Sequence, residues 1–232
     1  GRLRRKTKHI PWDLLDEAGI SWAYYYSDLP FLGLFGDLLM RPEARFLDQY
    51  FVDCAEGTLP QVCMVEPSFS GNDDHPPKNP VRGQLFLASV YNALATSPLW
   101  PRSLMSITYD EHGGFFDHVP PPKAADARNK KGFDQLGFRV PGLVVGPWVR
   151  QGLVTDTEFD HTSPLAHIER HFGLEPLTKR DAAANDFFEL LDHDRMAAGD
   201  PLEPVELPVL ELTEEELDDM CTVSDNRAVR TS

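Results

Sequence analysis

The sequence has no apolar run near the roughly 18 residues that a membrane-spanning helix needs. It also has no signal-peptide core, because the basic residues at its start lead into polar ones. The chain opens with Gly1 and not with Met, so we expect it to begin inside a longer protein or at a processed end. No internal repeat is present. The chain has 232 residues, of which 41% are apolar and 10% aromatic. This length and composition are enough for one sizeable folded domain with an apolar core.

Basic residues are scarce, with 22 Lys and Arg against 37 Asp and Glu, and the formal net charge is −15. This balance argues against nucleic-acid binding, since phosphate backbones need a basic surface. Part of the charge is local, because residues 203–219 hold eight carboxylates and no Lys or Arg. We expect residues 1–202 to form the folded domain, and residues 203–232 an acidic, poorly ordered tail or a loosely docked helix.

Cysteine is rare as well. Cys54, Cys63 and Cys221 match no zinc-site spacing, and their odd number excludes a complete set of intramolecular disulfides. A disulfide between Cys54 and Cys63 and two buried free thiols both remain open, so the cysteines do not identify the compartment.

Short apolar runs alternate with helical patterns along residues 10–175. Helices are expected at residues 11–18, 41–50, 81–96 and 164–172, and strands at residues 20–26, 59–67, 104–111 and 138–149. This alternation predicts an α/β layered domain with a largely parallel sheet. Ligands of such sheets gather outside the carboxyl ends of the strands, where three polar clusters of this sequence are expected.

The first cluster, DEHGGFFDHVPPP, follows the strand expected at residues 104–111. Adjacent carboxylates at Asp110 and Glu111 are costly to bury unless a cation offsets their repulsion. Mg²⁺, Ca²⁺ or Mn²⁺ would take these oxygens, and Zn²⁺ or Fe would also accept the imidazole of His112. Asp117 and His118 suit an outer pair in which the acid orients the imidazole. A solvated turn with scattered charge is the alternative.

The second cluster lies in the loop at residues 70–80, after the strand that ends at Glu66. Prolines restrict Asp73, Asp74 and His75 there, and spacing alone leaves a functional role and simple exposure of His75 equally open.

The third cluster is FDHTSP, residues 159–164, just before an expected helix. Ser163 is expected to cap that helix, while His161 lies where an anionic ligand would be favoured. His167 and His171 have the spacing of a metal pair without its usual context, so we expect them to be surface or half-buried residues.

These strings together resemble one known family. TYDEHGGFFDHVPPP is similar to the signature of the phosphoesterases that include non-specific, phosphatidylcholine-cleaving phospholipases C and related bacterial acid phosphatases. DLLDEAGISWAYYYSDLP, VEPSFSGNDDHPP, GFRVPGLVVGPWV and FDHTSPLAHIERHFGL occur in the family's order. The resemblance covers about residues 10–175. Sulfatases and phosphomutases, by contrast, lack the DEHGGFFDHV string.

The resemblance implies an alkaline-phosphatase-like fold, a bound divalent metal of unknown identity, and phosphoester hydrolysis through a covalent phospho-enzyme. It implies that Asp110 and Glu111 are metal ligands, and that His75 and His161 are catalytic groups on the phosphate or metal side. The implied partners are a phospholipid or a small phosphoester, with peripheral membrane contact and no nucleic acid. The implied location is secreted or in the cell envelope.

One departure from the family pattern matters. The family's amino-terminal half carries a metal motif and a Ser or Thr nucleophile, and neither occurs in these 232 residues. We therefore expect an α/β fold whose amino-terminal half is missing. The first hypothesis is a metal-dependent phosphoesterase whose nucleophile lies elsewhere. The second is a catalytically inactive remnant that binds a phosphate ligand or a partner chain.

Overall fold

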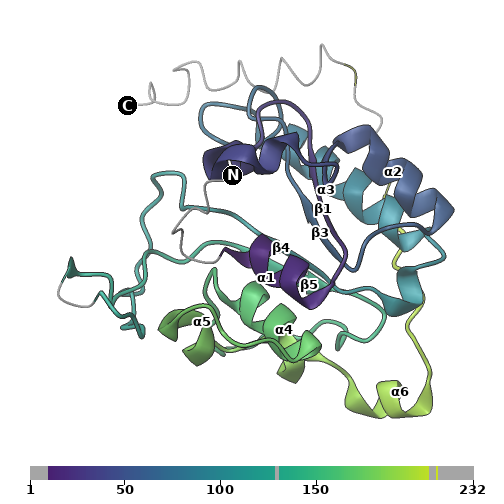
Figure 1. Cartoon of the computed structure of the whole chain (residues 1–232). Coiled ribbons are helices and arrows are strands. Elements are labelled where there is room, and N and C mark those ends of the chain that lie inside the picture. The colour runs from purple at the N-terminus through teal and green to yellow at the C-terminus, as the bar shows by residue number, and fades with distance from the viewer. Residues whose placement is uncertain (1–9, 129–130, 209–212, 214–232) are drawn as a thin grey trace, which may run out of the picture. The chain divides into compact units, whose positions relative to one another are not determined.

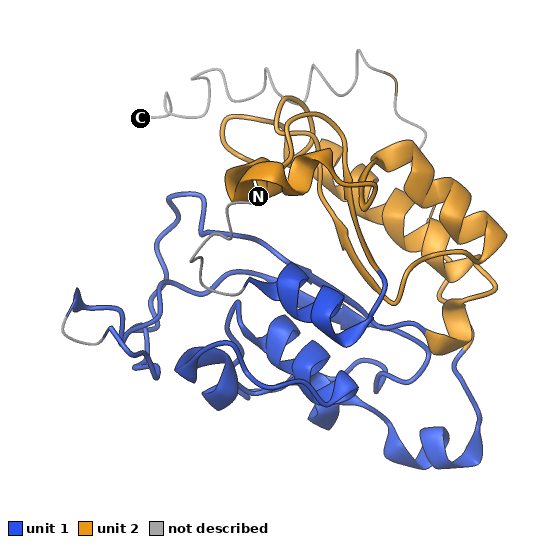
Figure 2. Cartoon of the chain, viewed as in Figure 1, with its two compact units in different colours: residues 1–21, 103–202 blue, residues 22–102, 203–232 orange. Residues whose placement is uncertain are grey.

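The computed structural model describes residues 10–128, 131–208 and 213. The chain divides into two compact units (Figure 2). Unit 1 contains residues 1–21 and 103–202, and unit 2 contains residues 22–102 and 203–232. Each unit is treated below by itself.

Unit 2 is built on a three-stranded parallel sheet (Figure 1). Strand β1 (Trp22–Tyr26) lies between β2 (Ala44–Phe46) and β3 (Val62–Val65), with Tyr24 opposite Ala44 and Trp22 opposite Val62. Four of the five β1 side chains are buried, as expected for a central strand that is covered on both faces. The run of aromatic residues in β1 therefore becomes the core of unit 2.

Helices cover this sheet and join its strands. They are the 3-10 segment η1 (Phe31–Met40), the α-helices α2 (Leu47–Glu56) and α3 (Pro80–Ala95), and the short 3-10 turn η2 (Trp100–Arg102). Helix α2 packs against β1, β2 and α3. At the start of helix α3, Asn79 accepts a hydrogen bond from the Val81 amide and Pro80 occupies the first turn.

A buried carboxylate, Asp53, joins these elements. It accepts hydrogen bonds from the Tyr25 hydroxyl at 2.6 Å and from Arg45 Nη1 at 2.7 Å. Gln49 Nε2, one turn earlier on α2, donates to its other oxygen at 2.8 Å. Burial alone would raise the pKa of Asp53, but the hydrogen bonds from Tyr25, Gln49 and Arg45 outweigh burial and lower it. The ionised carboxylate thus connects β1, β2 and α2.

Unit 1 contains an antiparallel strand pair and most of the remaining helices. Strands β4 (Met105–Thr108) and β5 (Gly142–Val145) pair with Met105 opposite Val145. The helices are α1 (Pro11–Ala18), α4 (Ser163–Phe172), α5 (Lys179–Ala183), η4 (Phe187–Leu190) and α6 (His193–Ala198). Helix α4 packs against α5 and η4.

Two acidic side chains are buried together between α4 and α5. Glu169 and Asp181 are each 1% exposed and share a hydrogen bond. Burial, followed by the hydrogen bond to Asp181, raises the pKa of Glu169 to about 7. For Asp181 the hydrogen bonds from Thr178 outweigh burial and lower the pKa. Below about pH 7 Glu169 therefore holds a proton that it donates to the Asp181 carboxylate.

The α/β prediction is confirmed, since helices and a parallel sheet are both present. The helices expected at residues 11–18 and 81–96 form within one residue of their expected ends. The helix expected at residues 41–50 is wrong in its first half, because Ala44–Phe46 pairs with β1 as a strand and α2 starts at Leu47. The buried strand expected at residues 138–149 shortens to Gly142–Val145, because its partner β4 has only four residues, and Leu143 is exposed.

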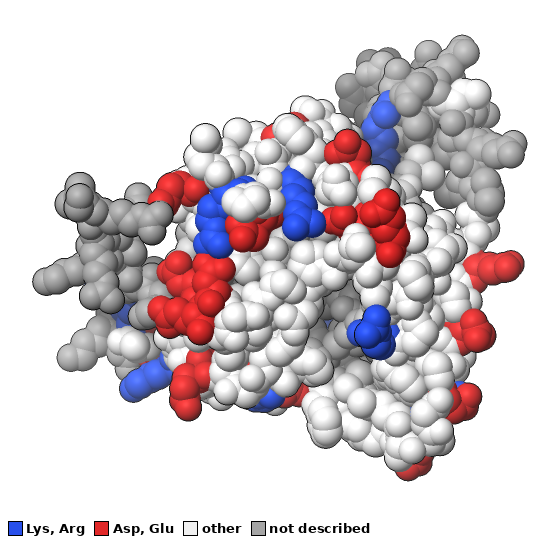
Figure 3. All heavy atoms as spheres, turned by 45° about the vertical axis from the view of Figure 1, so that its right-hand side comes forward, with Lys and Arg blue, Asp and Glu red and all other residues white. Residues whose placement is uncertain are grey.

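The structure also bears on the cysteines, the acidic tail and the surface charge. Cys54 is buried, Cys63 is exposed, and the two thiols are free. Cys221 and most of the expected acidic tail, residues 209–212 and 214–232, lie outside the described residues. Among the helices that the structure describes, none has the length and hydropathy of a transmembrane segment. Acidic side chains gather in patches on the face shown in Figure 3, in keeping with the net charge of −15.

We expect replacement of Asp53 to weaken unit 2. Asp53→Ala would leave the Tyr25 hydroxyl and Arg45 without their buried acceptor, so the free energy of unfolding in urea should fall by about 3 kcal/mol. Glu56→Ala, at an exposed acid on the same helix, is the matched control and should change stability by no more than about 0.5 kcal/mol. Equal effects of the two replacements would contradict the role of Asp53.

The Glu169–Asp181 pair predicts a pH dependence. The pKa of Glu169 is raised in the fold, from 4.5 to about 7, so its stabilisation is fully present below pH 4.5 and is lost as the pH rises through about 7. Glu169→Gln keeps a hydrogen-bond donor without titrating. We expect the melting temperature of the native chain, relative to this variant, to fall between pH 4.5 and 8. If the melting temperatures of the native chain and the variant change with pH in the same way, Glu169 is not the titrating group.

Candidate functional site

The turn after β4 presents two adjacent carboxylates. Asp110 and Glu111 are both exposed, two and three residues beyond the end of the strand. Glu111 Oε2 accepts a hydrogen bond from the Gly113 amide at 2.7 Å, which fixes the direction of that side chain. Gly113 and Gly114 have φ values of 62° and 79°, a conformation that glycine adopts without steric cost. The backbone thus reverses directly behind the acidic pair.

His161 lies against this turn, although it is 52 residues away in the chain. Its Nε2 is 2.8 Å from the carbonyl oxygen of Tyr109, the residue before Asp110. Because a carbonyl only accepts, Nε2 carries the proton in this contact, and Nδ1 of the neutral ring keeps its lone pair. Two of the three polar clusters expected from the sequence therefore meet in unit 1.

A tight turn holds His161 in place. Asp160 Oδ1 accepts hydrogen bonds from the Thr162 amide at 2.6 Å and from the Thr162 hydroxyl at 2.5 Å. The capping role expected for Ser163 is wrong, because Ser163 is the first residue of α4 and its Oγ instead accepts from the Asp160 amide at 3.0 Å. The polar groups before α4 are used to close the turn around His161.

Asp117 does not orient His118, contrary to the expectation from the sequence. It binds Arg139 with two short contacts, 2.7 Å to Nε and 2.8 Å to Nη2, whereas the His118 ring lies 3.6 Å away and is exposed. The hydrogen bonds from Arg139 hold the pKa of Asp117 well below its usual range. Asp117 therefore ties the DHVPPP segment to the chain just before β5.

The other rings of this region have separate surroundings. His112 packs edge-on against Phe138, with the two ring centroids 4.8 Å apart. The Nδ1 atom of His112 is buried and has no hydrogen-bond partner among the described residues. Phe115 and Phe116 are 74% and 84% exposed, so they do not anchor the turn in a core. His167 is half-buried and His171 is exposed, as expected from the sequence, and their ring centroids lie 6.2 Å apart in a stacked arrangement.

His75 belongs to unit 2, whereas Asp110, Glu111 and His161 belong to unit 1. Its imidazole is exposed, with Nδ1 2.9 Å from the Pro76 carbonyl oxygen, and its amide donates to Asp73 Oδ1 at 3.1 Å. The same Asp73 oxygen accepts from Lys78 Nζ at 2.8 Å. The loop that carries His75 is therefore held by an ion pair within unit 2.

Sequence reasoning missed Asp28, which follows β1 as Glu66 follows β3. Its carboxylate accepts from the Ser68 hydroxyl at 2.8 Å, and from the Phe69 and Ser70 amides at 3.1 and 3.0 Å. These hydrogen bonds, chiefly those from the two serines, outweigh burial and hold the pKa of Asp28 well below its usual range. Glu66 is buried, which raises its pKa, and it accepts from the Phe31 amide at 3.0 Å. An acid within two residues of the end of an apolar strand was the available signal for both.

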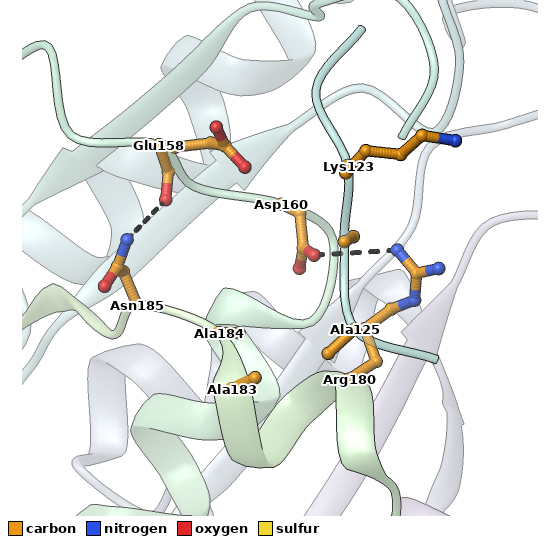
Figure 4. Close-up of a pocket in the computed structure, with 9 residues that line it drawn as sticks. Lys123, Ala125, Glu158, Asp160, Arg180, Ala183, Ala184 and Asn185 are labelled. Atoms are coloured by element: carbon orange, nitrogen blue, oxygen red, sulfur yellow. Dashed lines mark hydrogen bonds and ion pairs between the residues drawn. The ribbon is translucent and has the colours of Figure 1, made fainter. Parts of the chain in front are cut away.

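A small polar cavity of about 130 Å³ lies beside the His161 turn in unit 1 (Figure 4). Figure 4 shows Asp160 facing Arg180 across it, with Asp160 Oδ2 and Arg180 Nη1 4.0 Å apart, and Asn185 donating to the Glu158 carbonyl oxygen at 2.8 Å. Lys123 also lines the cavity. No sequence motif marked this group of side chains.

The donor set at the β4 turn fits part of a metal site. Asp110 and Glu111 offer carboxylate oxygens, the donors that hard divalent cations prefer. Across residues 10–128, 131–208 and 213, however, no three His, Cys, Asp or Glu side chains lie close enough together to hold an ion. A metal at Asp110 and Glu111 would need further ligands, such as water, substrate oxygens or other residues.

Comparison with known proteins assigns this arrangement to a family. The chain is 35% identical to "Non-specific phospholipase C1" of Arabidopsis thaliana over 229 residues, which is 84% of this chain and 43% of the relative. It is 30% identical to "Non-hemolytic phospholipase C" of Pseudomonas aeruginosa over 204 residues, 70% of this chain and 29% of that protein. The chain thus spans less than half the length of these relatives. The phosphoesterase family model matches residues 3–175, and the chain belongs to the phosphoesterase family.

Proposed function

We propose that this protein takes part in phosphoester hydrolysis of the phospholipase C type, with a phospholipid or a small phosphoester as its substrate. The observation that carries the proposal is the turn after β4, where His161 meets the carbonyl that precedes the Asp110–Glu111 pair. The family match and the names of the phospholipase C relatives support the same reaction class.

We propose that Asp110 and Glu111 supply two oxygen ligands to a divalent metal. When bound, such an ion would neutralise charge on the phosphoryl oxygens of the substrate. The exposure of both carboxylates leaves them open to an ion from solvent, and the Gly113 amide keeps Glu111 Oε2 in one orientation. The described residues do not complete the ligand set, so further donors come from water, from the substrate or from residues outside this group.

We propose that His161 binds the phosphoryl group or protonates the leaving oxygen. The Tyr109 carbonyl accepts from Nε2–H, so Nδ1 is the nitrogen left to face a ligand. Nδ1 donates a proton to the leaving oxygen only after it has taken one up from solvent, as imidazolium. His75, which is exposed on its loop in unit 2, is proposed for a second phosphate-side contact. The attacking hydroxyl is proposed to come from outside these 232 residues, because the family's nucleophile segment has no counterpart here.

A catalytically inactive protein that binds a phosphate ligand is the second candidate. It is favoured by the lack of a group of three metal ligands within the described part of the chain. Hydrolysis of an aryl phosphate by the full product of the gene, with and without chelator, separates the two functions. No turnover under any metal condition would leave only the binding function.

Replacement of the acidic pair tests the metal proposal directly. We expect Asp110→Asn and Glu111→Gln each to lower kcat/KM of the full gene product at least about a hundredfold, because each removes a charged ligand. Titration of the 232-residue chain with Mn²⁺ in a calorimeter provides a readout that does not need turnover. Asp156→Asn, at an exposed acid in the same unit, is the control and should leave both kcat/KM and the affinity for Mn²⁺ unchanged. Undiminished Mn²⁺ binding in both variants would rule the pair out as ligands.

His161→Gln tests proton donation. If His161 protonates the leaving oxygen, the loss of kcat should be about 10²–10⁴-fold for an alkyl phosphoester and much smaller for a nitrophenyl ester, whose leaving group needs no proton. His171→Gln, at an exposed imidazole on α4, is the matched control. An equal loss for both kinds of leaving group would favour a binding role for His161.

A further inference from the structure

Arg180 of α5 is a mostly buried arginine that the proposed chemistry does not use. Its side chain is 18% exposed, and it lines the small polar cavity beside the His161 turn. A guanidinium that has lost most of its hydration needs acceptors around it, because an unpaired buried charge is costly. The partners of Arg180 therefore indicate what this side chain does.

On one side, Arg180 binds the segment between β4 and β5. Its Nη2 donates to the Phe133 carbonyl oxygen and lies 3.4 Å from Asp126 Oδ2. Asp126 already has a cation of its own, since Arg128 Nε and Nη2 contact its two oxygens at 3.1 Å each. Arg128 thus balances the charge of Asp126, which leaves the positive charge of Arg180 for another acid.

That acid is Asp160, on the other side of the cavity (Figure 4). Arg180 Nη1 is 4.0 Å from Asp160 Oδ2, and the Asp160 side chain is 13% exposed. The two oxygens of this carboxylate have different partners. Oδ1 accepts from the Thr162 amide and hydroxyl, whereas Oδ2 faces the guanidinium. The orientation of Asp160 is therefore set by Thr162 and by Arg180 together.

The backbone that carries Arg180 is itself ordered. Thr178 caps α5, and its hydroxyl accepts from the Arg180 amide at 3.1 Å. Helix α5 packs against α4, whose first residue, Ser163, lies two residues after His161. Arg180 thus reaches the His161 turn from a fixed helix.

We propose that Arg180 is a positioning residue for His161 and acts through Asp160. Arg180 orients the Asp160 carboxylate, and this carboxylate closes the turn that carries His161. The closed turn keeps His161 Nε2 against the Tyr109 carbonyl and leaves Nδ1 for the ligand. This inference rests on the proposed function, because it concerns how the ring that contacts the substrate is held.

The tautomer of His161 tests the proposal without turnover. Two-bond correlations between ring nitrogens and ring protons, recorded on the 232-residue chain at a pH where imidazole is neutral, should show His161 protonated at Nε2 alone. Arg180→Ala and Asp160→Asn should each replace this pattern by the averaged one of a mobile ring. His161→Gln assigns the signals.

Two further variants separate positioning from a loss of the fold. Asp160→Asn keeps the size of the side chain and an oxygen for Thr162, so it gives an answer even if Arg180→Ala does not fold. Arg195→Ala is the matched control, because Arg195 also pairs with two acids in unit 1 but lies on α6. It should leave the His161 signals unchanged.

Hydrolysis of an alkyl phosphoester by the full gene product provides a second measurement. Arg180→Ala and Asp160→Asn should each lower kcat/KM about tenfold, since a small displacement of a reacting group slows the chemical step. The double variant should lose no more than either single variant, because both act through one contact.

Three results would overturn the proposal. They are averaged His161 signals in the unaltered chain, Nε2 protonation that persists in both variants, and additive losses of kcat/KM in the double variant. Failure of the proposed function gives a different result, in which the His161 signals change in both variants although the unaltered gene product hydrolyses nothing. Arg180 then positions a ring that binds its ligand without turnover.

Discussion

The arrangement of unit 2 depends on the buried carboxylate of Asp53. A charge that is removed from water must be met by donors, and here Tyr25 of β1, Arg45 of β2 and Gln49 of α2 supply them. Three elements are thereby held in one register, with β1 in the centre of a parallel sheet. The carboxyl ends of β1 and β3 then lie side by side, so Asp28 and Glu66 organise the segments that follow these strands. Glu66 holds the start of η1 through the Phe31 amide, and Asp28 holds the segment after β3 through the Phe69 amide.

Unit 1 places its candidate site by a different principle. The acidic pair stays in water, where two adjacent charges cost little, and the Gly113 amide fixes the orientation of Glu111. His161 reaches the Tyr109 carbonyl from across the chain, Asp160 closes the turn around His161, and Asp117 is neutralised by Arg139. The turn is thus ordered by contacts within the chain, which spans less than half the length of its phospholipase C relatives.

Local signals explain which elements could be predicted. Pro11 and Gly19 bracket α1, Asn79 and Pro80 start α3, and Gly173, in the left-handed conformation, follows the last residue of α4. The sequence predicts a helix over residues 44–46 wrongly, because their strand conformation comes from pairing with β1, which no local pattern records. For the same reason Asp28 went unnoticed, since its donors lie about 40 residues further along the chain. Asp117 and His118 are adjacent in sequence, which favours a pair, yet Arg139 offers a bidentate partner that one imidazole nitrogen cannot match.

The sequence by itself determined the α/β class, the family and the chemical character of the β4 turn, because these depend on residue types and on their order along the chain. Only the tertiary structure decided that His161 meets this turn, that Asp28 and Glu66 share one end of a sheet, and that Arg180 faces Asp160. These three features depend on contacts between residues that are far apart in the sequence. Their energies depend on burial and on hydrogen-bond geometry, which exist only once the chain has folded.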